Sequence, residues 1–66
     1  MRLTINDKEA QFTGNTLAEL LNMHGFGDKT GVAVAVNEIV IPRPEWQFHV
    51  LEEGDEILII IPAQGG

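Results

Sequence analysis

The sequence contains no cysteine and few basic residues: four of its 66 residues are lysine or arginine. The lack of cysteine excludes disulfides, thiolate metal ligands and a cysteine nucleophile. Ten acidic residues give a net charge of −6, which disfavours binding to nucleic acid or to an anionic membrane. The same charge suits docking onto a basic surface of another protein, or it serves solubility alone.

Long apolar runs are also absent. Residues 1–10 lack the apolar core of a signal peptide, and no run reaches the length of a transmembrane helix. We therefore expect a cytoplasmic protein. A chain of this length forms one domain that buries about 60% of the surface of its unfolded form, which leaves little room for a deep substrate pocket. The 44% hydrophobic content indicates that this domain folds.

The patterns that usually mark a catalytic, metal or phosphate site are missing as well. His24 and His49 lie far apart and lack metal-ligand spacing. The glycine-rich stretch 25–31 (GFGDKTG) lacks the spacing of a phosphate-binding loop and follows a predicted helix. The acidic stretch 52–56 (EEGDE) favours a solvated turn, with partner docking as the alternative. We expect no catalytic residue, no metal and no cofactor bound by the chain itself.

What the sequence does contain is a regular alternation of strands with one helix. A capping box at Thr16 and Glu19 begins the helix, Leu17, Leu20 and Leu21 form its apolar stripe, and Gly25 ends it. Strands are predicted at 2–6, 9–13, 32–36, 39–41 and 57–61.

The last predicted strand, 57–61 (ILIII), is apolar on both faces, which is typical of a central strand. Pairing it in parallel with the first strand requires a crossover, to which the helix can contribute. The predicted fold is therefore α+β: a β-grasp (ubiquitin-like) mixed sheet of about five strands with one main helix on one face. The domain spans 1–61, and residues 62–66 form a flexible C-terminal tail.

This tail, PAQGG, offers a chemical function that needs no catalytic side chain. Pro62 stops the strand, and glycines without Cβ atoms let a thin chain enter another protein's active site. We expect Ala63, Gln64 and Gly65 to be presented to partner enzymes. The group that arrives there is the Gly66 α-carboxylate, which needs activation, most simply as an acyl-adenylate, before a sulfur nucleophile can convert it to a thiocarboxylate.

Several motifs resemble those of the thiamine-biosynthesis sulfur-carrier proteins, the ThiS family, over essentially the whole chain. They are Val36-Asn37-Glu38, Ile41–Trp46 (IPRPEW), Leu51–Ile57 (LEEGDEI) and the terminal Gly65-Gly66. Ile41 stands where the family pattern has valine, and Pro62 in the tail is similar to the small subunit of molybdopterin synthase.

The resemblance implies a carrier rather than an enzyme. Its Gly66 carboxylate would be adenylated by an E1-like enzyme using ATP and Mg, take sulfur from a sulfur-donating protein, and pass it to thiazole synthase. Three alternatives remain open: a sulfur carrier for molybdenum-cofactor synthesis, a ubiquitin-like modifier of protein lysines, and an interaction domain whose terminal glycines are incidental.

The strands at 32–36 and 57–61 carry apolar side chains on both sheet faces, whereas one helix covers only one face. We therefore expect an exposed apolar docking surface on the other face, and name Ile59, Ile61 and Phe48 as candidates. Arg43 and Trp46 are expected to join the PRPEW segment to the domain rather than to contact a substrate.

Overall fold

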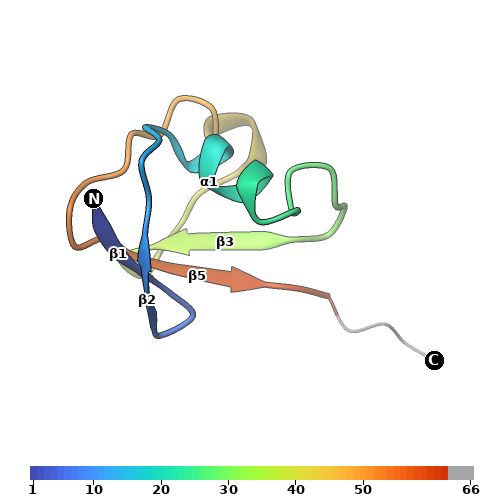
Figure 1. The fold of residues 1–66 in the computed structure, drawn as a ribbon. Coiled ribbons are helices and arrows are strands. Elements are labelled where there is room, and N and C mark those ends of the chain that lie inside the picture. Colours follow the sequence, from blue (N-terminus) through green and yellow to red (C-terminus); the bar gives the residue numbers. More distant parts are fainter. Residues whose placement is uncertain (63–66) are drawn as a thin grey trace.

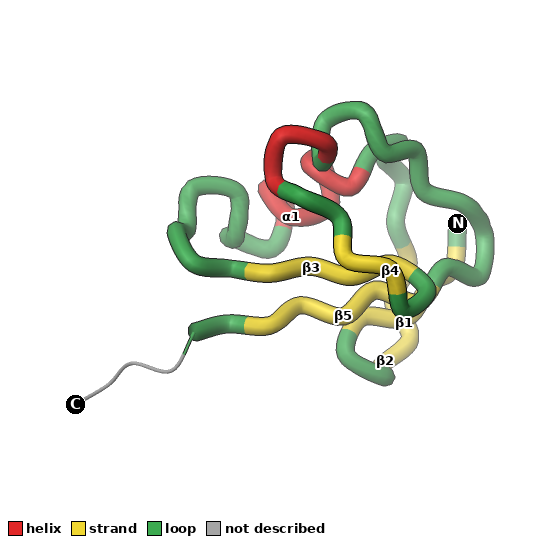
Figure 2. The backbone as a smooth tube through the Cα atoms, turned by 180° about the vertical axis from the view of Figure 1, so that it is seen from behind, coloured by secondary structure: helices red, strands yellow, loops and turns green. Residues whose placement is uncertain are grey.

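The computed structural model of the chain describes residues 1–62. In this part a five-stranded mixed sheet has the strand order β2-β1-β5-β3-β4 (Figure 1; β4 is labelled in Figure 2). The elements are β1 (Arg2–Ile5), β2 (Lys8–Gln11), α1 (Leu17–Met23), β3 (Ala33–Val36), β4 (Ile39–Val40), the 3₁₀ turn η1 (Arg43–Glu45) and β5 (Glu56–Ile60). The predicted β-grasp fold is confirmed, and the last strand is central as expected.

Helix α1 packs on one face of the sheet, and within residues 1–62 no element covers the other face (Figure 2). The Thr16 hydroxyl accepts a hydrogen bond from the Glu19 N–H, and the Glu19 carboxylate accepts one from the Thr16 N–H, so the predicted capping box is present. The helical stripe Leu17, Leu20 and Leu21 is fully buried. No helix in residues 1–62 is long and apolar enough to cross a membrane.

Two tight hairpins connect the outer strands to the sheet. In each hairpin both turn residues have positive φ: 50° and 70° at Asn6-Asp7, and 51° and 71° at Asn37-Glu38. Such two-residue turns match the right-handed twist of the paired strands, and asparagine and aspartate tolerate them better than most residues do. Glu38 adopts the conformation as well, so the turn predicted at Asn37-Glu38 forms without a glycine.

The central strand β5 is paired on both sides. It runs parallel to β1, with Ile5 opposite Ile57, and antiparallel to β3, with Ala33 opposite Ile60. The Asn6 carboxamide adds two bonds near the end of this strand: its Oδ1 accepts from the Ile59 N–H at 2.7 Å, and its Nδ2 donates to the Ile59 carbonyl at 3.3 Å. The end of β5 is therefore held from both neighbours.

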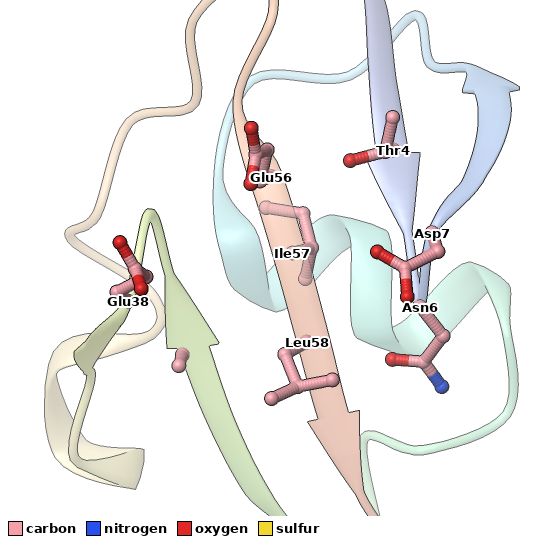
Figure 3. Close-up of a pocket in the computed structure, with 8 residues that line it drawn as sticks. Thr4, Asn6, Asp7, Glu38, Glu56, Ile57 and Leu58 are labelled. Atoms are coloured by element: carbon pink, nitrogen blue, oxygen red, sulfur yellow. The ribbon is translucent and has the colours of Figure 1, made fainter.

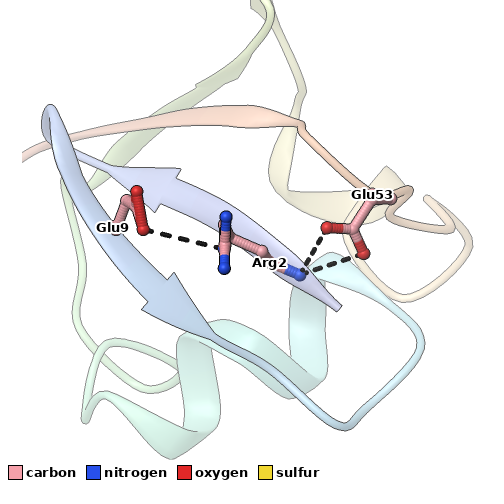
Figure 4. Close-up of polar contacts among 3 residues, drawn as sticks. All are labelled: Arg2, Glu9 and Glu53. Carbon is pink, nitrogen blue, oxygen red and sulfur yellow. Dashed lines mark hydrogen bonds and ion pairs between the residues drawn. The ribbon is translucent and has the colours of Figure 1, made fainter.

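The start of β1 is attached to the turn that precedes β5 (Figure 4). The Arg2 N–H donates to both carboxylate oxygens of Glu53, at 3.1 and 3.0 Å. The Arg2 side chain also pairs with Glu9 across the hairpin at 3.7 Å, but both side chains are more than 60% exposed. An exposed pair of this kind contributes only about 0–1 kcal/mol, so the strand pairing itself holds this end.

Several predicted strand boundaries differ from the observed ones by one or two residues. Strand β2 ends at Gln11, and Phe12 is buried in the core instead. Strand β4 ends at Val40, because Pro42 cannot continue the ladder and the chain turns into η1. Strand β5 covers 56–60 rather than 57–61.

Candidate functional site

The first part of the site is the root of the C-terminal segment, where β5 ends. Because β5 lies between β1 and β3, this segment starts from the middle of the sheet. Ile61 and Pro62 follow the strand, and both are exposed. The tail residues predicted to act, Ala63, Gln64, Gly65 and Gly66, lie outside the described residues.

The second part is the helix-free sheet face. Leu58 and Ile60 of β5 point to this face and are 48% and 51% exposed. Leu58 lies opposite Ala35 of β3, which in turn lies opposite Val40 of β4. We call these four residues, Ala35, Val40, Leu58 and Ile60, the apolar face. An exposed apolar surface on this side of the sheet was predicted, but its members differ from the candidates.

The three residues named from the sequence do not form this surface. Ile59 is only 5% exposed and belongs to the core under α1, so its assignment was wrong. Phe48 is 75% exposed, but it lies beside His49, whose carbonyl accepts the Leu17 N–H at the start of α1, on the helix side. Ile61 is half exposed and lines a hollow beside the loop after α1 instead.

The sequence held the signal that would have found the right residues. Glu56 is exposed at the start of β5, and side chains on a strand alternate between faces. Glu56 therefore shares its face with Leu58 and Ile60, and Ile57 shares the other with Ile59. The run of isoleucines hid this alternation.

Acidic side chains border the apolar face. Glu56, Glu38 and Asp7 surround a shallow hollow whose lining also includes Ala35 and Leu58 (Figure 3). They come from β5 and from the two hairpin turns, which the sheet brings to the same region. The face thus combines apolar side chains with acidic side chains near Ala35 and Leu58.

The third part is the loop of residues 26–31, which follows α1 and leads into β3 beside the end of β5. The Arg43 guanidinium donates from Nη1 to the Gly27 carbonyl at 3.0 Å and from Nη2 to the Lys29 carbonyl. It also lies 4.4 Å from the centre of the Trp46 ring. Trp46 is 4% exposed and donates from Nε1 to the Ile41 carbonyl at 2.8 Å. Arg43 and Trp46 therefore join the PRPEW segment to the domain, as predicted.

Two of the sequence motifs meet at the other end of β5. The Asp55 carboxylate, in a residue 8% exposed, accepts from Asn37 Nδ2 at 3.0 Å and from the Glu52 N–H at 2.8 Å. The Asn37 carboxamide oxygen accepts from the Glu56 N–H at 2.9 Å. These contacts fasten the turn before β5 to the β3–β4 hairpin and account structurally for both motifs.

Within residues 1–62 no group of three or more histidine, aspartate or glutamate side chains is arranged to hold a metal ion. His24 caps the C-terminal end of α1, and His49 lies in the segment after η1. In the same part of the chain every buried side-chain nitrogen or oxygen has a hydrogen-bond partner.

The strand order, the one covered face and the central last strand define a ubiquitin-like β-grasp domain. Comparison with known proteins gives the family. The model of the ThiS family matches residues 3–66, and the chain belongs to this family.

Individual relatives agree along the whole chain. The sulfur carrier protein ThiS of Escherichia coli (strain K12) is 34% identical over 67 residues, with 100% of both chains covered. A crystal structure of the thiamine biosynthesis protein ThiS from Geobacter metallireducens superposes with a TM-score of 0.83 at 26% identity, with both chains fully covered. A solution NMR structure of a thiamine biosynthesis protein from the same organism gives a TM-score of 0.80 at 26% identity, covering 100% of this chain and 88% of that one.

Proposed function

We propose that this chain is a sulfur carrier for thiamine biosynthesis, and that its Gly66 α-carboxylate carries the sulfur as a thiocarboxylate. The observation that supports this most is the full-length similarity to a relative named as the sulfur carrier protein ThiS. The match to the ThiS family model extends through Gly65-Gly66.

The reaction proceeds in two balanced steps on the partner enzyme. A Gly66 carboxylate oxygen attacks the α-phosphorus of ATP, which forms an acyl-adenylate and releases pyrophosphate; Mg belongs to the ATP and the enzyme. Hydrosulfide (HS⁻), the nucleophile that inorganic sulfide supplies, then attacks the acyl carbon, expels AMP and loses its proton to solvent. The new C–S bond leaves a thiocarboxylate, which thiazole synthase consumes as its sulfur source.

The described domain contributes recognition. The apolar face holds two half-exposed side chains, Leu58 and Ile60, and acidic side chains lie around its Leu58 end. Opposite charges across an interface speed encounter and select the partner, while apolar burial supplies affinity. We propose that this face docks on the E1-like adenylating enzyme, through a partner surface with an apolar centre and basic residues around it.

Intact-mass measurement tests the chemistry. The full-length protein is incubated with an E1-like adenylating enzyme, ATP, Mg and inorganic sulfide. We expect a gain equal to the mass of sulfur less that of oxygen, and no gain after deletion of Gly66 or amidation of its carboxylate. Arg2→Gln, at the opposite end of β5 from the tail, is a control that should gain the same mass.

Two results would overturn the proposal. One is an unchanged mass with every adenylating enzyme tried from the thiamine and molybdenum-cofactor pathways. The other is isopeptide-linked adducts of Gly66 with protein lysines, which would identify a modifier instead. Transfer of labelled sulfur to the product of thiazole synthase assigns the carrier to thiamine synthesis, and transfer only to molybdopterin contradicts that assignment.

A further inference from the structure

The loop of residues 26–31 contacts the root of the C-terminal segment. We propose that this loop, held in place by Arg43, sets the direction in which the segment leaves the domain, and that Arg43 is thereby a positioning residue for modification of Gly66. This inference rests on the proposed function, because it assigns a role in presenting the same carboxylate.

Arg43 connects the loop to the core through hydrogen bonds and a stacking contact. Its guanidinium donates to two loop carbonyls, those of Gly27 and Lys29, which are 16 and 14 positions away in the sequence. The same group is stacked on Trp46, whose ring is buried and bonded to the Ile41 carbonyl. Because the planar guanidinium makes both bonds at once, it fixes the orientation of the loop as well as its distance from Arg43.

The loop in turn contacts Pro62. Gly31 has φ of +77°, and a Cβ atom built on it would lie 3.1 Å from Pro62 Cγ and 3.7 Å from Pro62 Cβ. The Gly31 backbone therefore packs closely against the proline ring. Ile61 and Pro62 also line one hollow together with loop residues Asp28, Lys29 and Thr30.

The strand contacts around β5 end before Pro62. The pairing of β5 with β3 ends at Ala33 and Ile60, and the Asn6 carboxamide reaches only as far as Ile59. Pro62 has no N–H to extend the ladder. Among the described residues, the loop is thus the structure that packs against Pro62 once the strand has ended.

Direction matters because reactivity depends on where the carboxylate arrives. A displacement of about 1 Å at a reacting group can lower a rate by about 100-fold. A change at the root should therefore lower the turnover of a docked carrier, while docking through the apolar face is unaffected.

Two glycines provide a matched pair of variants: Gly25, directly before the loop, and Gly31, the last residue of the loop. Gly31→Ala introduces a methyl group against Pro62 at a positive φ. Gly25→Ala imposes the same kind of backbone strain at φ +82°, with no atom within 4 Å of the new methyl. Arg43→Gln tests the bonds that hold the loop to the domain, and Arg2→Gln is its charge-matched control.

We expect Gly31→Ala and Arg43→Gln to lower kcat for adenylation of the full-length carrier by about tenfold or more, with KM for the carrier within about twofold of wild type. Gly25→Ala and Arg2→Gln should retain wild-type kcat. In NMR spectra of the isolated protein, the Ile61 amide should shift in the first two variants, and the Leu58 amide in none. Thermal melts establish that each variant is folded.

Equal kcat losses in Gly31→Ala and Gly25→Ala would overturn the inference, as would an increase in KM with kcat unchanged. If Gly31→Ala does not fold, Arg43→Gln decides alone. If no adenylating enzyme modifies the wild-type protein, the proposed function is refuted. The NMR shifts would then still test whether the loop positions Ile61 and Pro62.

Discussion

The docking role of the apolar face can be tested by making its two exposed strand residues polar. Leu58→Thr combined with Ile60→Thr removes most of the apolar side-chain surface that β5 presents on this face. Threonine retains high strand propensity and adds no charge, so the sheet should form normally. The pair opposite, Ala35 and Val40, is left unchanged.

The expected magnitude follows from the exposures. Leu58 and Ile60 are 48% and 51% exposed, so a partner can still cover about half of each side chain. Full burial of such a side chain contributes about 1.5–3 kcal/mol, so the remaining halves together contribute about the same amount. Since 1.4 kcal/mol corresponds to a tenfold change, the double variant should weaken Kd by about 10- to 100-fold.

Isothermal titration of an E1-like adenylating enzyme with the full-length carrier measures this effect, and the KM for the carrier should rise in parallel. Ile39→Thr is the matched control. Ile39 is 66% exposed and also lies on a strand, but it is opposite the buried Val36 and so points to the other face. Equal affinities for wild type and the double variant, or an equal loss in Ile39→Thr, would refute a specific role of the apolar face.

Two further predictions concern stability. Asp55→Ala leaves Asn37 Nδ2 and the Glu52 N–H without their acceptor, so the free energy of unfolding should fall by about 2–3 kcal/mol; a thermal melt by circular dichroism should show a decrease in Tm of roughly 10–20 °C, with Glu52→Ala as control, because Glu52 is exposed and the substitution keeps its backbone N–H. Thr16→Ala removes the hydroxyl that accepts from the Glu19 N–H and should cost about 1 kcal/mol, whereas Thr16→Ser should retain most of it in urea titrations.

Local signals in the sequence were sufficient for most of the fold. The capping box at Thr16 and the hairpin at Asn37-Glu38 are each set by neighbouring residues, so they could be predicted without the rest of the chain. The central place of β5 followed from its apolar character. The sheet face to which each of its residues points did not follow, because residues 57–61 are all apolar and show no alternation. The exposed Glu56 indicates which residues share the solvent-facing side, but the prediction did not use it.

The contacts around the tail root, in contrast, are not set by neighbouring residues in the sequence. Arg43 bonds to carbonyls at Gly27 and Lys29, and carbonyl groups have no sequence signature, since every residue carries one. The approach of Gly31 to Pro62 depends on how β3 and β5 align. Such contacts depend on the assembled fold, which explains why sequence reasoning gave Arg43 and Trp46 a structural role without finding the loop that Arg43 holds.

The placement of the proposed docking surface on the same strand as the tail constrains the partner. Leu58 and Ile60 belong to β5, which is paired on both sides, so the docked face and the tail root form one rigid element. Gly66 lies six residues beyond Ile60 in the sequence. A fully extended chain spans at most about 3.3–3.6 Å per residue, so the carboxylate can reach roughly 20 Å from that contact. The adenylating centre of a partner that binds the apolar face must therefore lie within roughly 20 Å of the surface that covers Ile60.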